Sequence, residues 1–583
     1  MHVVATAGHV DHGKSSLVRA LTGTDPDRLE EERRRGLSIQ LGYAWTSLPG
    51  AGDLAFVDVP GHERFITTML AGVGPVPAVL FVVAADDPWM PQAAEHLAAL
   101  DALRVEHAVV AVTRSDLTDP GPAAARAAAE LAGTSLRGAP VVPVSSRTGD
   151  GLPALRSRLV ELVTAVPAAD PHAGVRLWVD RRFTVSGAGT VVTGTLPAGT
   201  VAVGDRLSTG TGTVRVRGVQ TLGRTVESVS GVARVALNVS GDVTDLDRTS
   251  NLTTPGAHRW TQVVDVRLTG GSDGVPLRPM LHVGAMSLPT RCRPLARDLV
   301  RLTLQRPLPL HVGDRALLRD PGSRQVWGVQ VLDPLPPPLR RRGAALERAR
   351  VLETVTGPDV LSEVRRRAVV DLDTLRQIGV PDLPAPASLV RAGRWVMSAD
   401  RAEQAAHQVR EALTEHDRAH PLDRGLPLTV LADRVGLPSP DLVAAVVRAP
   451  LRVEGGRVTA VDGLPAGLER ALATLAGDLA EHPFQAPTAD RLGDLGLDAA
   501  GVAAAARAGR LLRLAPGIVL MPDADRRAVD ELAQLPQPFT ASEARSRLAT
   551  SRRVVLPLLE HLDRARLTRR LPDDRRMVVP PPT

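Results

Sequence analysis

The segment "HVVATAGHVDHGKSSLVRAL" (residues 2–21) predicts a strand, a loop and a helix at the start of this chain. An apolar run predicts a buried strand over 2–7, and "SSLVRAL" predicts a helix directly after the loop. Between them, Gly8, Gly13, Lys14 and Ser15 complete the pattern G-x-x-x-x-G-K-[ST], which in this strand–loop–helix context indicates a phosphate-binding loop. The backbone amides of such a loop surround a β-phosphate, and the helix N-terminus adds its dipole. The other nucleotide-binding residues expected here are Asp11, His12 and Ser16.

Lys14 is the only lysine of the chain, which otherwise uses arginine at each of its basic positions, 69 in number. A phosphate loop holds a compact ammonium between the β- and γ-phosphates, where a planar guanidinium is too large. The hydroxyl of Ser15 is expected to be a ligand of Mg²⁺. The lysine therefore strengthens the prediction of a nucleoside triphosphate site.

A second phosphate-site segment is "DVPGHERF" (58–65), at the end of the apolar run 54–59. Asp58 can hold Mg²⁺ through water, and the amide of Gly61 can contact the γ-phosphate. His62 follows at the position where an attacking water molecule would lie. We therefore expect His62 to be the catalytic residue.

Selectivity for guanine is expected from "TRSD" (113–116), which follows a strand predicted over 107–113. Asp116 can accept hydrogen bonds from both N1–H and N2–H₂ of guanine, a pair of donors that adenine lacks. Most GTPases have Asn-Lys-x-Asp here; in this chain Thr113 replaces the asparagine and Arg114 the lysine, and a guanidinium can still lie flat along a base. The backbone of the next loop, at Ser145 and Ser146, can meet guanine O6. These loops together predict GTP and GDP as the ligands.

The sequence has three parts with different patterns of predicted secondary structure. Strands alternate with helices over 1–170, which predicts an α/β domain with a mainly parallel sheet. Short Val- and Thr-rich runs broken by glycine turns then predict two antiparallel β-barrels, over 175–253 and 257–335. After the proline-rich linker 333–343, a rhythm of two helices and a basic strand pair predicts tandem winged-helix modules. Their expected ranges are 345–403, 404–464, 465–524 and 525–583.

Composition narrows the class of protein. The longest uncharged apolar stretch, 76–85, is about half the length of a membrane span, and the first residues lack the pattern of a signal peptide. The single cysteine, Cys292, excludes an intramolecular disulfide and is expected to be a small buried hydrophobe. Residues 540–578 carry ten arginines against five acidic residues, which indicates a nucleic-acid face. We expect a cytoplasmic monomer that does not contact a membrane.

Several motifs together carry a resemblance to a known family. "GHVDHGKS" (8–15), "RGLSI" (35–39), "DVPGHERF" (58–65) and "GAGTVVTG" (187–194) resemble the translational GTPases related to elongation factor Tu. Within that group, the chain is similar to the bacterial selenocysteine-specific elongation factors, on the segments 20–45, 179–195, 214–220 and 233–242. A winged-helix tail after three elongation-factor domains is typical of that family.

The resemblance implies further residue roles. Ser38 would complete Mg²⁺ coordination where the family usually has threonine, and Val10 and Leu37 would form an apolar gate beside His62. The ribosome would position His62 to orient water and stabilise developing charge. The pocket for the selenocysteine side chain would contain Asp180, Arg181 and Arg234. An mRNA hairpin would be bound by arginines of the last module, at Arg552, Arg553, Arg569, Arg570, Arg575 and Arg576.

The implied function is delivery of selenocysteinyl-tRNA to the ribosome at a recoded UGA codon. A selenol is ionised at neutral pH and a serine hydroxyl is not, so two arginines would favour the selenolate. Ion pairing on the surface of the barrel remains the alternative for these residues. Two other functions remain open: a translational GTPase that carries another aminoacyl-tRNA, and a nucleotide-gated winged-helix regulator that binds DNA.

Overall fold

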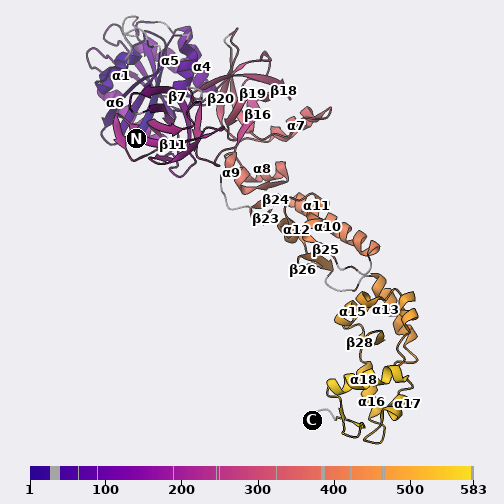
Figure 1. Ribbon diagram of the computed structural model, residues 1–583. Coiled ribbons are helices and arrows are strands. Elements are labelled where there is room, and N and C mark those ends of the chain that lie inside the picture. The colour runs from indigo at the N-terminus through magenta and orange to yellow at the C-terminus, as the bar shows by residue number, and fades with distance from the viewer. Residues whose placement is uncertain are drawn as a thin grey trace. The chain divides into compact units, whose positions relative to one another are not determined.

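The computed structural model of the chain divides into two compact units, residues 1–366 with 371–384 and residues 367–370 with 385–583 (Figure 1). The structure describes residues 1–579 apart from 27–37, 39, 63–64, 88, 188, 245, 248–249, 324, 382–387, 421–422, 424, 461–463 and 465. Leu37, predicted to be part of the apolar gate, lies outside the described residues.

The first unit begins with a mainly parallel sheet in the strand order β2-β3-β1-β4-β5-β6. The expected strands are present, and the structure adds an antiparallel edge strand, β2, that was not predicted. Its side chains alternate irregularly between buried and half-buried, which gives no clear two-residue period. The strands are β1 (His2–Ala7), β2 (Gly42–Leu48), β3 (Gly52–Asp58), β4 (Ala78–Ala84), β5 (His107–Thr113) and β6 (Val141–Pro143).

Helices cover both faces of this sheet, as the alternation of strands and helices predicts. Apolar side chains of α1 (Lys14–Thr22) and α6 (Leu152–Ala165) pack in a core with Val4 and Phe56 on one face. The neighbouring residue Val3 faces the other core, together with side chains of the remaining helices. These are α3 (Ile66–Val73), α4 (Pro91–Ala102) and α5 (Gly121–Leu131). The strand ends that carry the predicted motifs therefore meet at one edge.

Two antiparallel barrels follow, and they confirm the predicted fold class. In the first, β10 pairs with both β15 and β11 and so closes the ring β10-β15-β7-β8-β14-β11, with β12 added beside β11. Its strands are β7 (Arg176–Val185), β8 (Gly189–Leu196), β10 (Arg206–Ser208), β11 (Thr213–Thr221), β12 (Arg224–Val226), β14 (Ala233–Gly241) and β15 (Asn251–Thr253), with a small separate pair β9 (Thr200–Ala202) and β13 (Ser228–Ser230).

The second barrel is closed in the order β16-β19-β18-β17-β20-β21, and Cys292 is buried in its core, as expected. Its strands are β16 (Trp260–Leu268), β17 (Met280–Val283), β18 (Met286–Pro294), β19 (Leu299–Pro309), β20 (Arg315–Arg319) and β21 (Val326–Asp333). Each barrel has its own apolar core.

The segment 345–403, predicted as one winged-helix module, is divided between the two units. Buried ion pairs hold its first helices on the second barrel: Arg348 lies 2.7 Å from Asp265, and Arg366 lies 2.8 Å from Asp333. Each pair joins opposite charges, and this pairing offsets the free-energy cost of burying them. The elements of this segment are α7 (Ala344–Glu353), α8 (Val360–Arg367), β22 (Val369–Asp371), α9 (Leu372–Gln377), β23 (Leu389–Ala392) and β24 (Trp395–Ser398).

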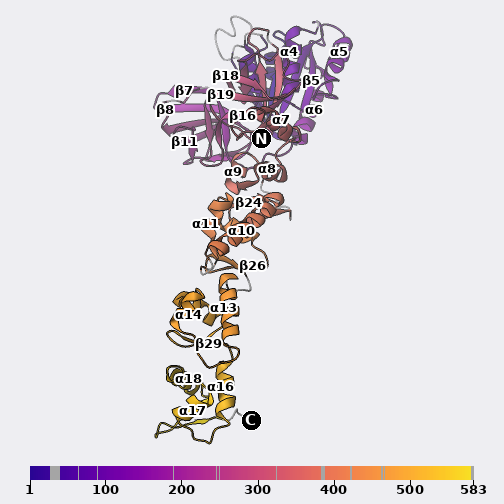
Figure 2. The same cartoon turned by 90° about the vertical axis from the view of Figure 1, so that its right-hand side faces the viewer.

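The rest of the second unit repeats a helix, a helix pair and a small sheet, the pattern of a winged helix (Figure 2). The first repeat is α10 (Ala399–Ala419), β25 (Leu426–Pro427), α11 (Leu428–Val435), α12 (Pro440–Val446), β26 (Leu451–Glu454) and β27 (Arg457–Ala460). The second is α13 (Ala466–Asp478), α14 (Ala489–Asp494), α15 (Ala499–Arg507), β28 (Leu512–Ala515) and β29 (Ile518–Leu520). The last is α16 (Ala524–Leu532), α17 (Ala541–Arg547), α18 (Arg552–Arg564), β30 (Thr568–Arg570) and β31 (Arg576–Val578).

Candidate functional site

The loop between β1 and α1 has the backbone that its glycines permit. Gly8 has φ 126°, and a Cβ there would overlap the carbonyl oxygen of Val82. Gly13 has φ 81°, a left-handed conformation that favours glycine, at the point where α1 begins. The loop therefore needs both glycines to adopt this backbone conformation. A cleft lies beside the loop and is lined by Val10, Lys14 and other loop residues, and by Gly61, Thr113 and Asp116. The N-terminus of α1 points at this cleft.

Lys14 lies inside this loop and is 6% exposed. Its Nζ donates hydrogen bonds to the carbonyl oxygens of His9, at 2.6 Å, and Gly8, at 3.2 Å. Gly61 packs against the same place, because a Cβ at residue 61 would overlap both Nζ of Lys14 and the amide nitrogen of Val10. The structure thus brings the two predicted phosphate-site segments together around one ammonium group.

The three predicted metal-site side chains also converge. Oγ of Ser15 lies 2.7 Å from Oδ2 of Asp58 and 3.1 Å from Oγ of Ser38. Oδ1 of Asp58 accepts a hydrogen bond from Thr6 at 2.6 Å, which fixes the carboxylate. Two hydroxyls and a carboxylate beside a phosphate loop are the oxygen donors that Mg²⁺ prefers, so the residues present fit this ion. Sequence reasoning missed Thr6, which lies in an otherwise apolar strand.

At the other end of the cleft, Thr113 and Arg114 hold the phosphate loop from the end of β5. Oγ1 of Thr113, which is buried, donates to the carbonyl oxygen of His12 at 2.7 Å. The guanidinium of Arg114 donates to Asp86 at 3.0 Å and to the carbonyl oxygen of Asp11. Thr113 therefore links β5 to the loop, and Arg114 lies at the rim of the cleft.

Asp116, the residue predicted to select guanine, lines the cleft beside Ser146. Nε of Arg147 donates to Oδ2 of Asp116 at 2.9 Å. Hydrogen bonds from Ser145 and then from Arg147 lower the pKa of the Asp116 carboxyl below its usual value. Asp116 is therefore a carboxylate at neutral pH. Sequence reasoning missed Arg147, although it follows the predicted serine pair directly.

Some predicted residues lie under the cleft and do not line it. Ser145 is fully buried, and its Oγ accepts hydrogen bonds from the amides of Arg147 and Thr148. The ring of His12 is 1% exposed and lies 3.4 Å from Asp87. Burial lowers the pKa of His12 to about 4. The ring is therefore neutral at pH 7 and supports the loop from below.

A second histidine, His96 of α4, also supports the loop. Its Nδ1 accepts a hydrogen bond from the amide of Gly8 at 3.0 Å. Burial lowers the pKa of His96 to about 3, so Nδ1 stays unprotonated and able to accept. Sequence reasoning missed this residue, because the 88 residues between Gly8 and His96 give no local signal.

His62 lies one residue beyond Gly61, with its ring centre 6.0 Å from that of Phe65. Within the described ranges, Val10 and Gly61 line the cleft and His62 does not. The predicted catalytic residue is therefore next to the phosphate site but outside the space that a nucleotide would fill.

A second cluster joins the α/β domain to the first barrel. Asp180 of β7 pairs with Arg234 of β14 through two hydrogen bonds, one of them 2.7 Å long, and accepts a further one from Thr193 at 2.7 Å. Arg181 donates to the carbonyl oxygen of Leu41 instead. The structure thus brings together Asp180 and Arg234, and Arg181 lies beside them with a different partner.

Tyr43 of β2 completes this arginine pocket, which we define as Tyr43, Asp180, Arg181 and Arg234. The guanidinium carbons of Arg234 and Arg181 lie 3.9 Å and 4.9 Å from the centre of the Tyr43 ring. Burial disfavours the charge on Arg234, but Asp180 outweighs that effect and raises the pKa of the guanidinium. Burial also raises the pKa of the Tyr43 phenol. Sequence reasoning missed Tyr43, which only the packing of β2 on the barrel brings here.

The arginines predicted to contact an mRNA hairpin differ in their surroundings. Arg552, at the start of α18, and Arg569, in β30, are exposed. Arg553 donates to the carbonyl oxygen of Pro487 in the preceding module at 2.9 Å. Arg570 pairs with Asp574, and Arg575 with Asp573. Arg576 is 5% exposed and pairs with Asp563 at 2.9 Å, so it stabilises the module from inside.

Comparisons with known proteins cover the whole chain. Residues 1–165 match the family model "Elongation factor Tu GTP binding domain", and residues 530–577 match "Elongation factor SelB, winged helix". The chain is 31% identical to a selenocysteine-specific elongation factor of Desulfomicrobium baculatum, over 99% of both chains. It is 34% identical to that of Escherichia coli K12, over 75% of this chain and 74% of the relative.

A crystal structure of a bacterial selenocysteine-specific elongation factor shares the fold, with a TM-score of 0.69 and 23% identity over the full length of both chains. Within the described ranges, no helix combines the length and apolar character needed to cross a membrane.

Proposed function

Since the chain belongs to the family of selenocysteine-specific elongation factors and is a translational GTPase, we propose that it carries selenocysteinyl-tRNA to the ribosome at a recoded UGA codon. In this proposal GTP binding favours the tRNA-bound state, and the last winged-helix module holds an mRNA hairpin. We expect the protein to act as a monomer in the cytoplasm, where ribosomes translate.

The arginine pocket is the observation that carries this proposal. Its two guanidiniums lie against one tyrosine ring, and among the described residues the carboxylate of Asp180 pairs with Arg234 and not with Arg181. The pocket therefore keeps a positive charge at Arg181 in a partly buried place. Such a site favours an anion over a neutral group of the same shape, so it favours a selenolate over a serine hydroxyl.

The cleft around Lys14 accounts for the GTPase activity of the family. Lys14 would pair with the β- and γ-phosphates, and Asp116 would accept the two guanine N–H donors. Ser15, Ser38 and Asp58 would hold Mg²⁺, which neutralises charge on the phosphate oxygens when it is bound. Thr6 keeps the Asp58 carboxylate in position for this role.

His62 would act as the catalytic residue by orienting the attacking water molecule. Because His62 does not line the cleft within the described ranges, a movement of the segment after Gly61 would have to precede hydrolysis. A slow enzyme that the ribosome activates needs such a step, because GTP hydrolysis before codon recognition would release the tRNA too early.

Filter binding of selenocysteinyl-tRNA and seryl-tRNA, each in GTP and in GDP, tests this function. In the presence of GTP, we expect selenocysteinyl-tRNA to bind at least about tenfold more tightly than seryl-tRNA. This difference is the effect of one charge-assisted interaction. Arg181→Gln should remove most of this preference, whereas Arg182→Gln, the exposed neighbour on β7, should keep it. Equal binding of both tRNAs would instead support a factor that carries another aminoacyl-tRNA.

The hairpin contact is tested in the last module. The double variant Arg552→Ala with Arg569→Ala should weaken hairpin binding by about tenfold or more. The slope of log affinity against log salt concentration should decrease by the amount expected for about two lost phosphate contacts. The matched control is Arg513→Ala, an exposed arginine in the strand pair of the preceding module, which should change little. Tight binding of duplex DNA without preference for an RNA hairpin would support a DNA regulator instead.

A further inference from the structure

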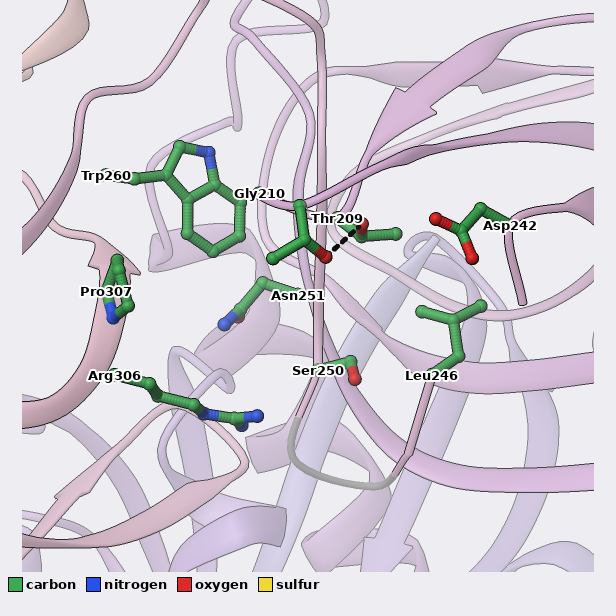
Figure 3. Close-up of a pocket in the computed structure, with 10 residues that line it drawn as sticks. Thr209, Gly210, Asp242, Leu246, Ser250, Asn251, Trp260, Arg306 and Pro307 are labelled. Carbon is green, nitrogen blue, oxygen red and sulfur yellow. Dashed lines mark hydrogen bonds between the residues drawn. The ribbon is translucent and has the colours of Figure 1, made fainter. Parts of the chain in front are cut away.

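A pocket outside both sites described above lies at the seam between the two barrels (Figure 3). Its walls come from the β10–β11 turn, from the segment that leads into β15, and from β16 and β19. The cavity is about 170 Å³, close to the roughly 150 Å³ that holds a benzene ring in a protein. It therefore has room for one ring-sized group, and it shares no lining residue with the GTP cleft.

Asn251 gives this pocket a buried polar group without a protein partner. The residue is 2% exposed, and its Nδ2 donates to Sδ of Met286 at 3.0 Å. Its Oδ1 is buried and, in the described part of the chain, accepts no hydrogen bond. A buried acceptor of this kind costs free energy unless a ligand satisfies it, so the site favours a ligand that presents an N–H donor.

Arg306 gives the pocket a cation, and Asp242 lines the opposite side of the same pocket (Figure 3). The Arg306 guanidinium lies 3.9 Å from Sδ of Met286 and, among the described residues, forms no ion pair. Figure 3 shows the guanidinium on the same side of the pocket as the Asn251 amide. A half-buried guanidinium that forms no ion pair with the described residues is suited to bind a phosphate.

Trp260 supplies an aromatic surface at the same place. A Cβ on Gly210 would lie 2.8 Å from atoms of the indole, so the β10–β11 turn packs closely on this ring. The indole and Pro307 both line the cavity. Flat apolar surfaces beside a cation are what proteins use to bind a nucleic-acid base by stacking.

We propose that this pocket binds one unpaired nucleotide whose base carries an exocyclic amine. The base stacks on Trp260, the amine donates to Oδ1 of Asn251, and the phosphate pairs with Arg306. Adenine, cytosine and guanine carry such an amine, whereas the imide N–H of uracil is flanked by carbonyl oxygens that would face the oxygen of Asn251. The site does not use the GTP cleft or the arginine pocket, so it stands or falls independently of the proposed function.

The test is calorimetric titration of the full chain loaded with one equivalent of GDP, which fills the GTP cleft and leaves no excess nucleotide to compete for the proposed pocket. The probes are AMP, CMP and UMP, and then the hexanucleotides of adenylate and of uridylate. We expect AMP and CMP to bind about tenfold more tightly than UMP, the effect of one buried hydrogen bond. Binding by the mononucleotides identifies a free nucleotide as a ligand, and binding by the hexanucleotide alone identifies an RNA strand.

Three variants and a control separate recognition from folding. Asn251→Ala should remove the preference for adenine over uracil, and Trp260→Leu should weaken binding of every base. Arg306→Gln should weaken binding and lower the salt slope by about one. Arg293→Gln, exposed on β18 of the same barrel, should bind as the wild type does. Unchanged GDP affinity in each variant shows that it is folded.

Three results would overturn the proposal. The first is equal affinity for AMP and UMP in the wild type. The second is no binding of any nucleotide or hexanucleotide at millimolar concentration, as a pocket for a protein side chain would give. The third is unchanged adenine preference in folded Asn251→Ala.

Discussion

The GTP cleft and the arginine pocket lie in the same compact unit, yet they are built in different ways. The cleft depends on short contiguous motifs, such as residues 8–15, whose glycines determine the backbone. The pocket depends on single side chains from β2, β7 and β14, which are far apart in the sequence. In the cleft, the backbone of a contiguous loop places the functional groups. In the arginine pocket, the packing of separate strands places them. Single substitutions in the cleft should therefore strongly change GTP binding or hydrolysis. Substitutions in the arginine pocket should act by changing its net charge.

The largest effect should come from His62, at the edge of the cleft. His62→Ala should leave the GTP dissociation constant nearly unchanged and lower ribosome-stimulated hydrolysis by about 10²- to 10³-fold, the range for losing one group that stabilises charge in the transition state. Single-turnover hydrolysis with and without ribosomes measures this. Phe65→Leu, which alters only the neighbouring ring, is the control. Unchanged stimulated hydrolysis would remove His62 from the mechanism.

Lys14→Arg tests whether the loop demands a compact ammonium. We expect GTP affinity to fall by about 100-fold, because the larger guanidinium cannot occupy the space between the carbonyl oxygens of Gly8 and His9. Arg114→Lys, the reverse change at the rim of the same cleft, should cost less than about tenfold. Equal losses in the two variants, measured by nucleotide titration, would contradict the steric argument.

Asp116→Asn tests base recognition in the cleft. The variant should lose selectivity for guanine and bind xanthosine triphosphate about 10- to 100-fold better relative to GTP, the effect of exchanging one bidentate contact. Because hydrogen bonds lower the pKa of Asp116, its carboxylate is lost only below the usual value of 3.8. Wild-type selectivity should therefore not change between about pH 7 and pH 5. Retained GTP selectivity in the variant would assign the base contact to another residue.

The smallest effect is expected in the arginine pocket and needs a paired change. Arg234→Gln alone would leave the buried Asp180 without its partner, which costs about 3 kcal/mol or more. Asp180→Asn with Arg234→Gln removes both charges and should unfold close to the wild-type temperature. Arg181 keeps its charge in the double variant, which should therefore bind seryl-tRNA normally and lose only about threefold in selenocysteinyl-tRNA affinity. If it still discriminates fully, Asp180 and Arg234 are surface ion pairing and not a recognition site.

The expectations from sequence were most complete where a motif is contiguous. The phosphate loop, the metal-site hydroxyls and the β-barrels follow from local patterns, and the fold class was confirmed. Arg147, His96 and Thr6 were not predicted, because each acts on a residue that lies at least 31 positions away. The edge strand β2 was missed for a different reason: it pairs with the adjacent strand β3, but its residues show no clear two-residue period.

Among the basic residues, sequence alone could not separate structural from exposed arginines. Arg552 and Arg576 lie in the same arginine-rich segment, but one is exposed and the other is 5% exposed and paired with Asp563. Arg553 likewise contacts the preceding module through backbone oxygens. The density of arginine indicates where nucleic acid could bind, and burial decides which of these side chains are available.

The GTPase fold, the barrels and the winged-helix tail could be predicted from the sequence, because glycine conformation and strand–helix periodicity are local properties, and the same motifs predict the residues of the phosphate site. The tertiary structure was needed to show that Tyr43 joins Asp180, Arg181 and Arg234, and that Asn251, Trp260 and Arg306 share a pocket between the barrels. Those groups come from different strands, and their proximity depends on the closure and docking of the barrels, which no local pattern specifies.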